Sequence, residues 1–196
     1  MCAWVGVTGV AVFVAVADGD AVARVCQAAE AARLSDGGRT VSEARDEVTR
    51  LGETPEVHVE RLARGKAAEV VARLANEADP ACVLAADTIV VVDGEILGKP
   101  TDDQDALRML LGLSGRTHRV VTGVALSVPG AAPESAVFES EVRFRHLTTE
   151  SASAYVASGE GRDKAGSYAI QGLGAGLVRE ISGSYTNVVG LPAAET

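Results

Sequence analysis

Only three of the eighteen basic residues of this chain are lysines, and the other fifteen are arginines. Each lysine lies in a block rich in glycine or alanine: Lys66 in RGKAAE, Lys99 in ILGKP and Lys164 in RDKAGSYAIQG. An ammonium on a flexible stem is a compact point charge that suits single phosphate oxygens, whereas a guanidinium prefers planar partners. The pattern therefore indicates contacts with phosphate. The alternative is that three lysines lie on the surface without a common task.

Asp87 is the strongest candidate for chemistry. It lies in the middle of the apolar run CVLAADTIVVV, which is rich in β-branched residues and predicts a strand buried on both faces. Burying a carboxylate is costly unless a cation or a hydrogen-bond donor meets it. We therefore expect Asp87 either to form a structural ion pair or to bind a metal ion and direct water at phosphorus. Thr88 follows it and offers a hydroxyl at the same end of the strand.

Three residues elsewhere could complete such a site. Lys99 follows the strand in a turn, from which its ammonium can bend back toward Asp87. Gln171 precedes Gly172 and carries an amide that both donates and accepts, which suits the edge of a nucleobase. Glu47, in a polar loop, could add a carboxylate to a metal site, although acidic residues in loops are most often merely solvated.

Other catalytic patterns receive no support. His58, His118 and His146 have no serine or cysteine in a nucleophile context beside them, so we expect them to be structural or exposed. The sequence contains neither a GxGxxG after a strand nor a GxxxxGK[ST]. A dinucleotide-binding fold and a P-loop are therefore not expected.

Five blocks in order along the chain resemble the Maf family of nucleotide pyrophosphatases, also known as septum formation inhibitors. The resemblance covers about three quarters of the chain, residues 46–192. The blocks are RLARGKA (61–67), AADTIVVVDGEILGKP (85–100), LSGRTHRVVTGVAL (113–126), YVASGE (155–160), and DKAGSYAIQG with GSYTNVVGLP in the tail.

The resemblance implies a two-lobed fold with a central cleft, similar to the inosine triphosphate pyrophosphatases, and commonly a homodimer. It also implies hydrolysis of a nucleoside triphosphate to the monophosphate and pyrophosphate with Mg²⁺ or Mn²⁺. Asp87 matches the family's catalytic acceptor, and Lys66 and Lys99 match its phosphate-contacting lysines. Thr88 and Gln171 match the pair that accompanies pyrimidine choice in the branch acting on dTTP and UTP.

One departure concerns residues 1–45. The family begins with a strand and a loop of the type S-x-S-P-R-R that meets the triphosphate, and no such motif precedes Asp46. Losing it would remove hydrogen bonds worth roughly 1.5–3 kcal/mol each. We hypothesise that these residues come from an altered or misread gene start. The rival function is a catalytically impaired nucleotide-binding or cell-division regulatory protein.

Composition narrows the class of partner. A net charge of -9 and a pI near 4.8 argue against a nucleic-acid partner. The cysteines, Cys2, Cys26 and Cys82, are too few and scattered for a disulfide framework, which favours the cytoplasm. The apolar run 5–17 resembles an export signal in length but has no basic residue before Arg24, and it is too short to span a membrane.

Local patterns predict an α/β chain with a mixed, twisted sheet, forming one domain over residues 1–196. A helix is expected from Pro55, capped by Thr54, and another is expected with Thr101 as its cap. The other expected elements are one strand before a helix at 20–34, strands at 82–92, 117–128 and 137–147, a helix at 149–158, and short strands and turns within 166–190.

Overall fold

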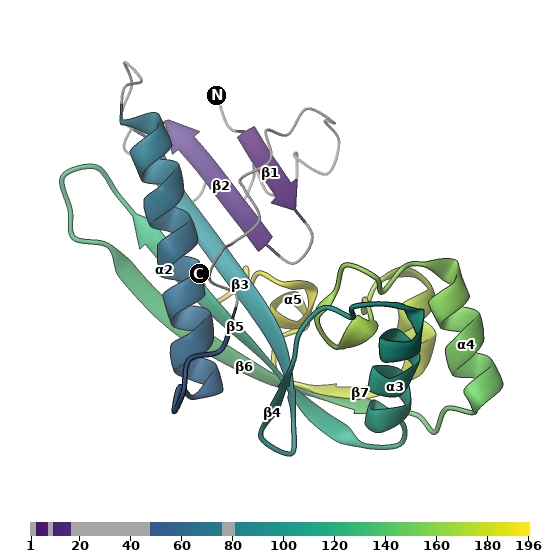
Figure 1. Ribbon diagram of the computed structural model, residues 1–196. Helices are drawn as coiled ribbons and strands as arrows, with labels where there is room; N and C mark the ends of the chain where they lie inside the picture. Colours follow the sequence, from purple (N-terminus) through teal and green to yellow (C-terminus); the bar gives the residue numbers. More distant parts are fainter. Residues whose placement is uncertain (1–2, 8–9, 17–47, 76–80) are drawn as a thin grey trace. The chain divides into compact units, whose positions relative to one another are not determined.

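The computed structural model describes residues 3–7, 10–16, 48–75 and 81–196, in which strands and helices follow one another along an α/β chain (Figure 1). The predicted α/β class is confirmed. The strands are β1 (Ala3–Val7), β2 (Val10–Val16), β3 (Ala81–Val92), β4 (Glu95–Leu97), β5 (Thr117–Ser127), β6 (Glu134–Phe144) and β7 (Val178–Ser182). The helices are α2 (Pro55–Leu74), α3 (Asp103–Leu113), α4 (Thr149–Ser158) and α5 (Tyr185–Val189), with 3-10 helices η2 (Ala165–Ser167) and η3 (Gly172–Leu177).

The strands hydrogen-bond in the order β1-β2-β3-β5-β6-β7, and β4 pairs with β3. The pairings β1/β2, β2/β3, β3/β4 and β6/β7 are all antiparallel. The turn from β3 to β4 consists of Asp93 and Gly94, with φ of 51° and 80°. A two-residue hairpin turn of type I′ requires positive φ at both positions, which explains the Asp-Gly pair. The short strand β4 was not predicted.

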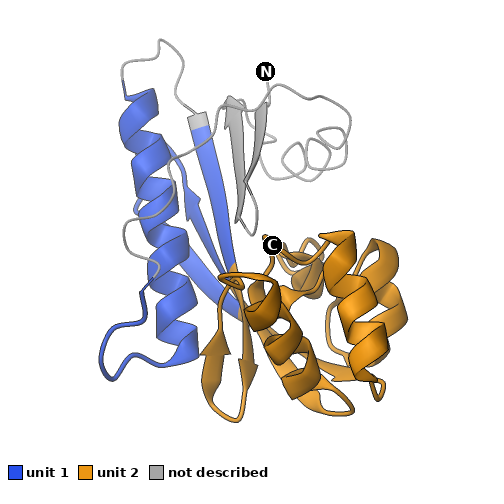
Figure 2. Ribbon diagram, turned by 45° about the vertical axis from the view of Figure 1, so that its right-hand side comes forward, with its two compact units in different colours: residues 1–87, 123–137 blue, residues 88–122, 138–196 orange. Residues whose placement is uncertain are grey.

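The chain divides into two compact units (Figure 2). Unit 1 contains residues 1–87 and 123–137, and unit 2 contains residues 88–122 and 138–196. The division crosses β3 between Asp87 and Thr88 and crosses β5 between Thr122 and Gly123. Each unit has its own cluster of buried apolar residues.

Helix α2 supplies one side of the core of unit 1. The Thr54 hydroxyl accepts a hydrogen bond from the Val57 N–H (3.4 Å) and Pro55 opens the helix, as predicted. Much of the packing surface is alanine, which lets the helix backbone approach the strands closely. The core residues are Ala63, Ala67 and Val70 from α2, Val83 and Ala85 from β3, and Ala125 from β5.

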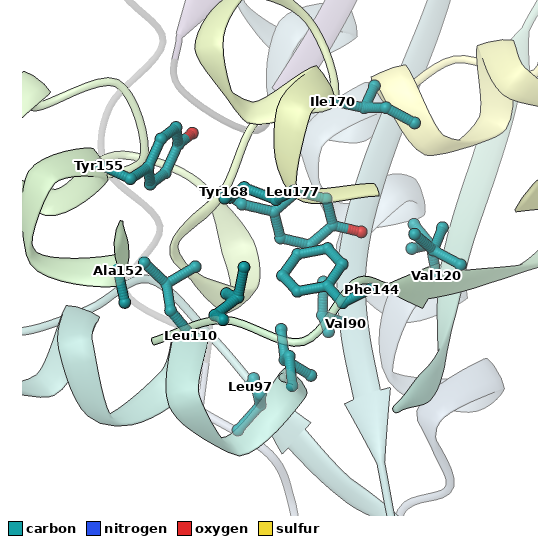
Figure 3. Packing of buried hydrophobic residues seen from close by; sticks show 13 residues of the cluster. Val90, Leu97, Leu110, Val120, Phe144, Ala152, Tyr155, Tyr168, Ile170 and Leu177 are labelled. Atoms are coloured by element: carbon teal, nitrogen blue, oxygen red, sulfur yellow. The ribbon is translucent and has the colours of Figure 1, made fainter. Parts of the chain in front are cut away.

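The core of unit 2 is larger and contains an aromatic cluster (Figure 3). The rings of His118, Phe144 and Tyr168 contact one another edge to face, with centroids 4.8–5.4 Å apart. His118 Nε2 and the Tyr168 hydroxyl form a hydrogen bond of 2.8 Å. Both side chains are buried, and burial raises the pKa of Tyr168. The prediction that His118 is structural is consistent with this packing.

Several predicted boundaries were wrong. The apolar N-terminal run forms two antiparallel strands, in which Trp4 pairs with Phe13, instead of one. The helix expected at 20–34 lies outside the described residues. Helix α3 is capped by Asp102, not Thr101, because the Asp102 carboxylate accepts the Asp105 N–H (2.8 Å).

The second predicted hairpin strand and the tail also differ. Strand β6 begins at Glu134, not 137, and Ser135 near its start is held by side chains of α2: it accepts from Arg64 Nε (2.8 Å) and donates to Glu60 (2.6 Å). It ends at Phe144 rather than at 147. The tail contains one strand, β7, and its turns are largely 3-10 helix.

Gly123 is expected to tolerate no larger residue. A Cβ added there would lie 2.4 Å from the Val59 carbonyl oxygen of α2, which is backbone and cannot rotate away. Gly123→Ala should therefore lower the free energy of unfolding by roughly 1–3 kcal/mol in urea denaturation. The matched control is Gly112→Ala in α3, where nothing lies within 4 Å and the change should stabilise by roughly 0.5–1 kcal/mol. Equal effects of the two substitutions would contradict this packing.

Burial of His118 predicts a loss of stability in acid. Burial lowers the pKa of His118 from 6.5 to about 4, so the unfolded chain binds a proton more readily than the folded one between these values. The free energy of unfolding therefore keeps its full value above pH 6.5 and decreases as the pH falls toward 4. The loss amounts to roughly 3 kcal/mol. His118→Phe should flatten the pH dependence of the melting temperature in this window. Replacing the exposed His146 by Gln should leave it unchanged.

Candidate active site

Lys66 and Asp87 form a buried ion pair in unit 1. Lys66 lies on the packed face of α2 beside Ala63 and Ala67, and its Nζ donates a hydrogen bond to Asp87 Oδ1 on β3. Only 8% of Lys66 and 6% of Asp87 is exposed. Each charge thus offsets part of the cost of burying the other. An ion pair at Asp87 is one of the two outcomes that the sequence led us to expect, and the structure contains it.

Asp87 lies where the pairing of β3 changes. Strand β2 pairs with β3 as far as Asp87, opposite Val10, and β4 pairs with β3 from Val90 onward. Thr88 and Ile89 lie between these two ladders. Because side chains alternate along a strand, Asp87 and Thr88 point to opposite faces of β3. The acid and the hydroxyl are consecutive in sequence but have different neighbours.

Thr88 belongs to a hydrogen-bonded chain of side chains within unit 2. Its Oγ1 lies 2.9 Å from Thr122 Oγ1, and the Thr122 hydroxyl lies 3.3 Å from the Asn187 carbonyl oxygen, which accepts from it. Asn187 is fully buried and donates through Nδ2 to the Val120 carbonyl (3.1 Å) and to Ser140 Oγ (2.9 Å). This network fixes the orientation of the Thr88 side chain.

Sequence reasoning assigned no role to Thr122 or Asn187. Both lie in blocks that carry the family resemblance, VVTGVAL and GSYTNVVGLP. Nothing in one sequence distinguishes a buried threonine or asparagine that orients a neighbour from one that caps a turn. The role of Asn187 follows from the short helix α5, which brings it to β5 and which was not predicted from the sequence.

Lys99 and Gln171 are both exposed residues of unit 2. Lys99 follows β4, and the adjacent Gly98 carbonyl accepts a hydrogen bond from the Gly166 N–H (3.0 Å). The segment before Lys99 is thereby attached to the DKAGSYAIQG block. Gln171 stands at the start of η3 with an extended backbone, and its side chain makes no capping hydrogen bond. The expectation that Lys99 approaches Asp87 stays a prediction.

Of the remaining residues singled out in the sequence, Lys164 and His58 lie beside carboxylates, and Glu47 lies outside the described residues. Lys164 forms an ion pair with Asp163 (2.7 Å) and is partly exposed. His58 is buried beside the Glu53 carboxylate (3.0 Å), which also binds Arg61 (2.7 Å). Hydrogen bonds from Arg61 hold the pKa of Glu53 well below its usual range. Glu47, the second predicted metal ligand, lies outside the described residues.

Two features of the described residues bear on where a metal ion or a polyphosphate could bind. Within 48–75 and 81–196 no group of three or more His, Cys, Asp or Glu side chains is arranged to hold a metal ion. A surface hollow at the start of α3 is lined by residues 100–104 and Arg162, but Asp102 and Asp103 give it excess negative charge. It therefore does not suit a polyphosphate.

The fold and the site together define an α/β protein in which a helix lysine and a strand aspartate meet in a small-residue core. The model of the Maf-like protein family matches residues 27–196, so the chain belongs to the Maf family. That match begins before residue 46, where the resemblance by motifs starts.

Curated relatives agree with this assignment. A dTTP/UTP pyrophosphatase of Shewanella denitrificans is 51% identical over 156 residues, covering 80% of this chain and 78% of the relative. One of Ralstonia nicotianae is 47% identical over 164 residues, covering 83% and 78%. One of Myxococcus xanthus is 51% identical over 158 residues, covering 80% and 78%.

Among the described residues, no helix has both the length and the apolar character needed to cross a bilayer.

Removing one partner of the buried pair should cost far more than removing one partner of an exposed pair. Lys66→Met takes the ammonium away from a buried carboxylate and should destabilise the protein by about 3–5 kcal/mol in calorimetry. Lys164→Met, at the partly exposed pair with Asp163, should cost about 0–1 kcal/mol. The double variant Lys66→Met/Asp87→Leu should recover most of the loss. If Lys66→Met costs no more than Lys164→Met, the pair contributes little to the fold.

Proposed function

We propose that this chain is a nucleoside triphosphate pyrophosphatase that hydrolyses dTTP and UTP to the monophosphate and pyrophosphate. The observation that carries the proposal is the buried Lys66–Asp87 pair, which sits in the two sequence blocks that match the family's phosphate lysine and catalytic acid. The relatives named dTTP/UTP pyrophosphatases, which share about half of their aligned residues with this chain, support the choice of substrate.

Each predicted residue has a role in this proposal. Asp87 accepts a proton from, or orients, the attacking water. Lys66 and Lys99 contact phosphate oxygens and offset the charge that builds up on them. Thr88 and Gln171 read the nucleobase. The inosine triphosphate pyrophosphatase-like fold belongs to the same proposal, and one domain over 1–196, a homodimer and a cytoplasmic location stay predictions.

A divalent cation fits these residues in one particular way. Mg²⁺ usually keeps several waters and binds through one or two carboxylates together with substrate phosphates. Asp87 is a single carboxylate that already faces an ammonium, so it suits an ion that arrives with the nucleotide better than a resident one. We propose Asp87, with Glu47 as a second carboxylate, as the protein ligands of Mg²⁺ or Mn²⁺. When bound, the ion would supply charge neutralisation at the phosphates.

The function is tested by pyrophosphate release. Purified protein incubated with Mn²⁺ should release pyrophosphate from dTTP and UTP faster than from GTP. Asp87→Asn, which is nearly the same size but cannot accept a proton as a carboxylate does, should release it about 10²–10⁴ times more slowly. Chelation of the metal should abolish release by the unaltered protein. Equal background release from both proteins would instead favour the non-catalytic nucleotide-binding protein.

A further inference from the structure

The loop after Gln171 is held by a carboxylate from the turn that follows α4. Glu160 accepts the Leu173 N–H through Oε1 (3.0 Å) and the Gly174 N–H through Oε2 (2.9 Å). These two amides lie two and three residues beyond Gln171. A carboxylate that accepts two backbone N–H groups forms charge-assisted hydrogen bonds, which are roughly twice as strong as neutral ones. Glu160 therefore fixes the chain on the C-terminal side of Gln171.

The chain before Gln171 is held by a side chain of α4 itself. The Tyr155 hydroxyl accepts the Ala169 N–H (3.0 Å), two residues before Gln171. Tyr155 is buried, and burial is the main reason that its pKa lies above its usual range, with the negative charge of Glu160 adding to the shift. The phenol therefore stays neutral at physiological pH.

Two glycines show how closely the loop fits this pair. A Cβ on Gly172 would lie 1.9 Å from Glu160 Oε1, and its φ of +65° is one that other residues rarely adopt. A Cβ on Gly174 would lie 1.8 Å from the Ala169 carbonyl oxygen and 2.9 Å from the Tyr155 hydroxyl. A side chain at position 174 would displace the backbone, and one at position 172 would need a strained backbone and would displace the Glu160 carboxylate, so glycine favours this path at both positions.

Gln171 itself is exposed and caps nothing with its side chain, so the direction of its amide depends on the backbone that carries it. An amide that both donates and accepts discriminates between base edges only if it is held in place. The loop is attached on both sides of Gln171, at Ala169 before it and at Leu173 and Gly174 after it. The position of the loop is therefore set by α4 and the turn after it.

We propose that Tyr155 and Glu160 are positioning residues that aim Gln171 at the nucleobase and so set the preference for a pyrimidine. This inference rests on the proposed function and deepens it. Neither residue contacts the reacting atoms in this scheme, since both act through the backbone of residues 169–174. Their loss should accordingly weaken binding and selectivity more than turnover.

The test uses Glu160→Gln, which keeps the shape but loses the charge and one acceptor, and Tyr155→Phe, which keeps the ring and loses the hydroxyl. Each should raise KM for dTTP about tenfold, change kcat little, and lower the preference for dTTP over GTP. In a Gln171→Ala background the same substitutions should add almost nothing. The matched control is Glu150→Gln, at an exposed acid in the first turn of α4, which should behave like the unaltered protein.

A second readout does not depend on activity. Amide hydrogen exchange at Leu173 and Gly174 should be about tenfold faster in Glu160→Gln, and exchange at Ala169 faster in Tyr155→Phe. Unchanged exchange, or effects on KM that add fully to those of Gln171→Ala, would overturn the inference while leaving the proposed function intact. If the unaltered protein releases no pyrophosphate from dTTP, the proposed function fails, and the role in base choice fails with it.

Discussion

The buried ion pair between Lys66 and Asp87 is the constraint on which the rest of unit 1 depends. Two opposite charges can be buried together only if helix α2 and strand β3 approach closely enough for their side chains to meet. Alanines on both elements and Gly123 on β5 provide that approach, because the backbone of α2 lies against a strand position with no room for a Cβ. The alanine-rich composition and the chemistry of the site are therefore two aspects of one packing arrangement.

In unit 2 the candidate residues are oriented by other residues rather than by direct ion pairing. Thr88 is held through Thr122 by the buried Asn187, and the loop of Gln171 is held by Glu160. These supports come from helices and turns distant in the sequence. Hydrogen bonds that converge from several elements favour one geometry, because another arrangement would leave more buried donors and acceptors without partners.

Sequence reasoning located the residues that chemistry demands and failed where tertiary contacts decide. Asp87 could be found because an acid in an apolar strand requires a partner, and Lys66 because it is one of only three lysines and lies in a block rich in glycine and alanine. The early start of β6 could not be found, since it is accompanied by hydrogen bonds between Ser135 and the side chains of α2. The roles of Asn187 and Glu160 depend on a five-residue helix and a turn, which are too short to carry a periodic pattern.

The central claim is that the Asp87 carboxylate, facing Lys66, acts in the reaction and not merely in binding or folding. The most direct measurement is the affinity of the unaltered protein and of Asp87→Asn for the α,β-methylene analogue of dTTP with Mn²⁺, by titration calorimetry. If the carboxylate acts in the reaction, the two dissociation constants should lie within about tenfold of each other, because most of the binding contacts remain. Loss of detectable binding by a folded Asp87→Asn protein would contradict this, since the main role of Asp87 would then be to bind the metal–nucleotide complex, and its role in the reaction would lose its support.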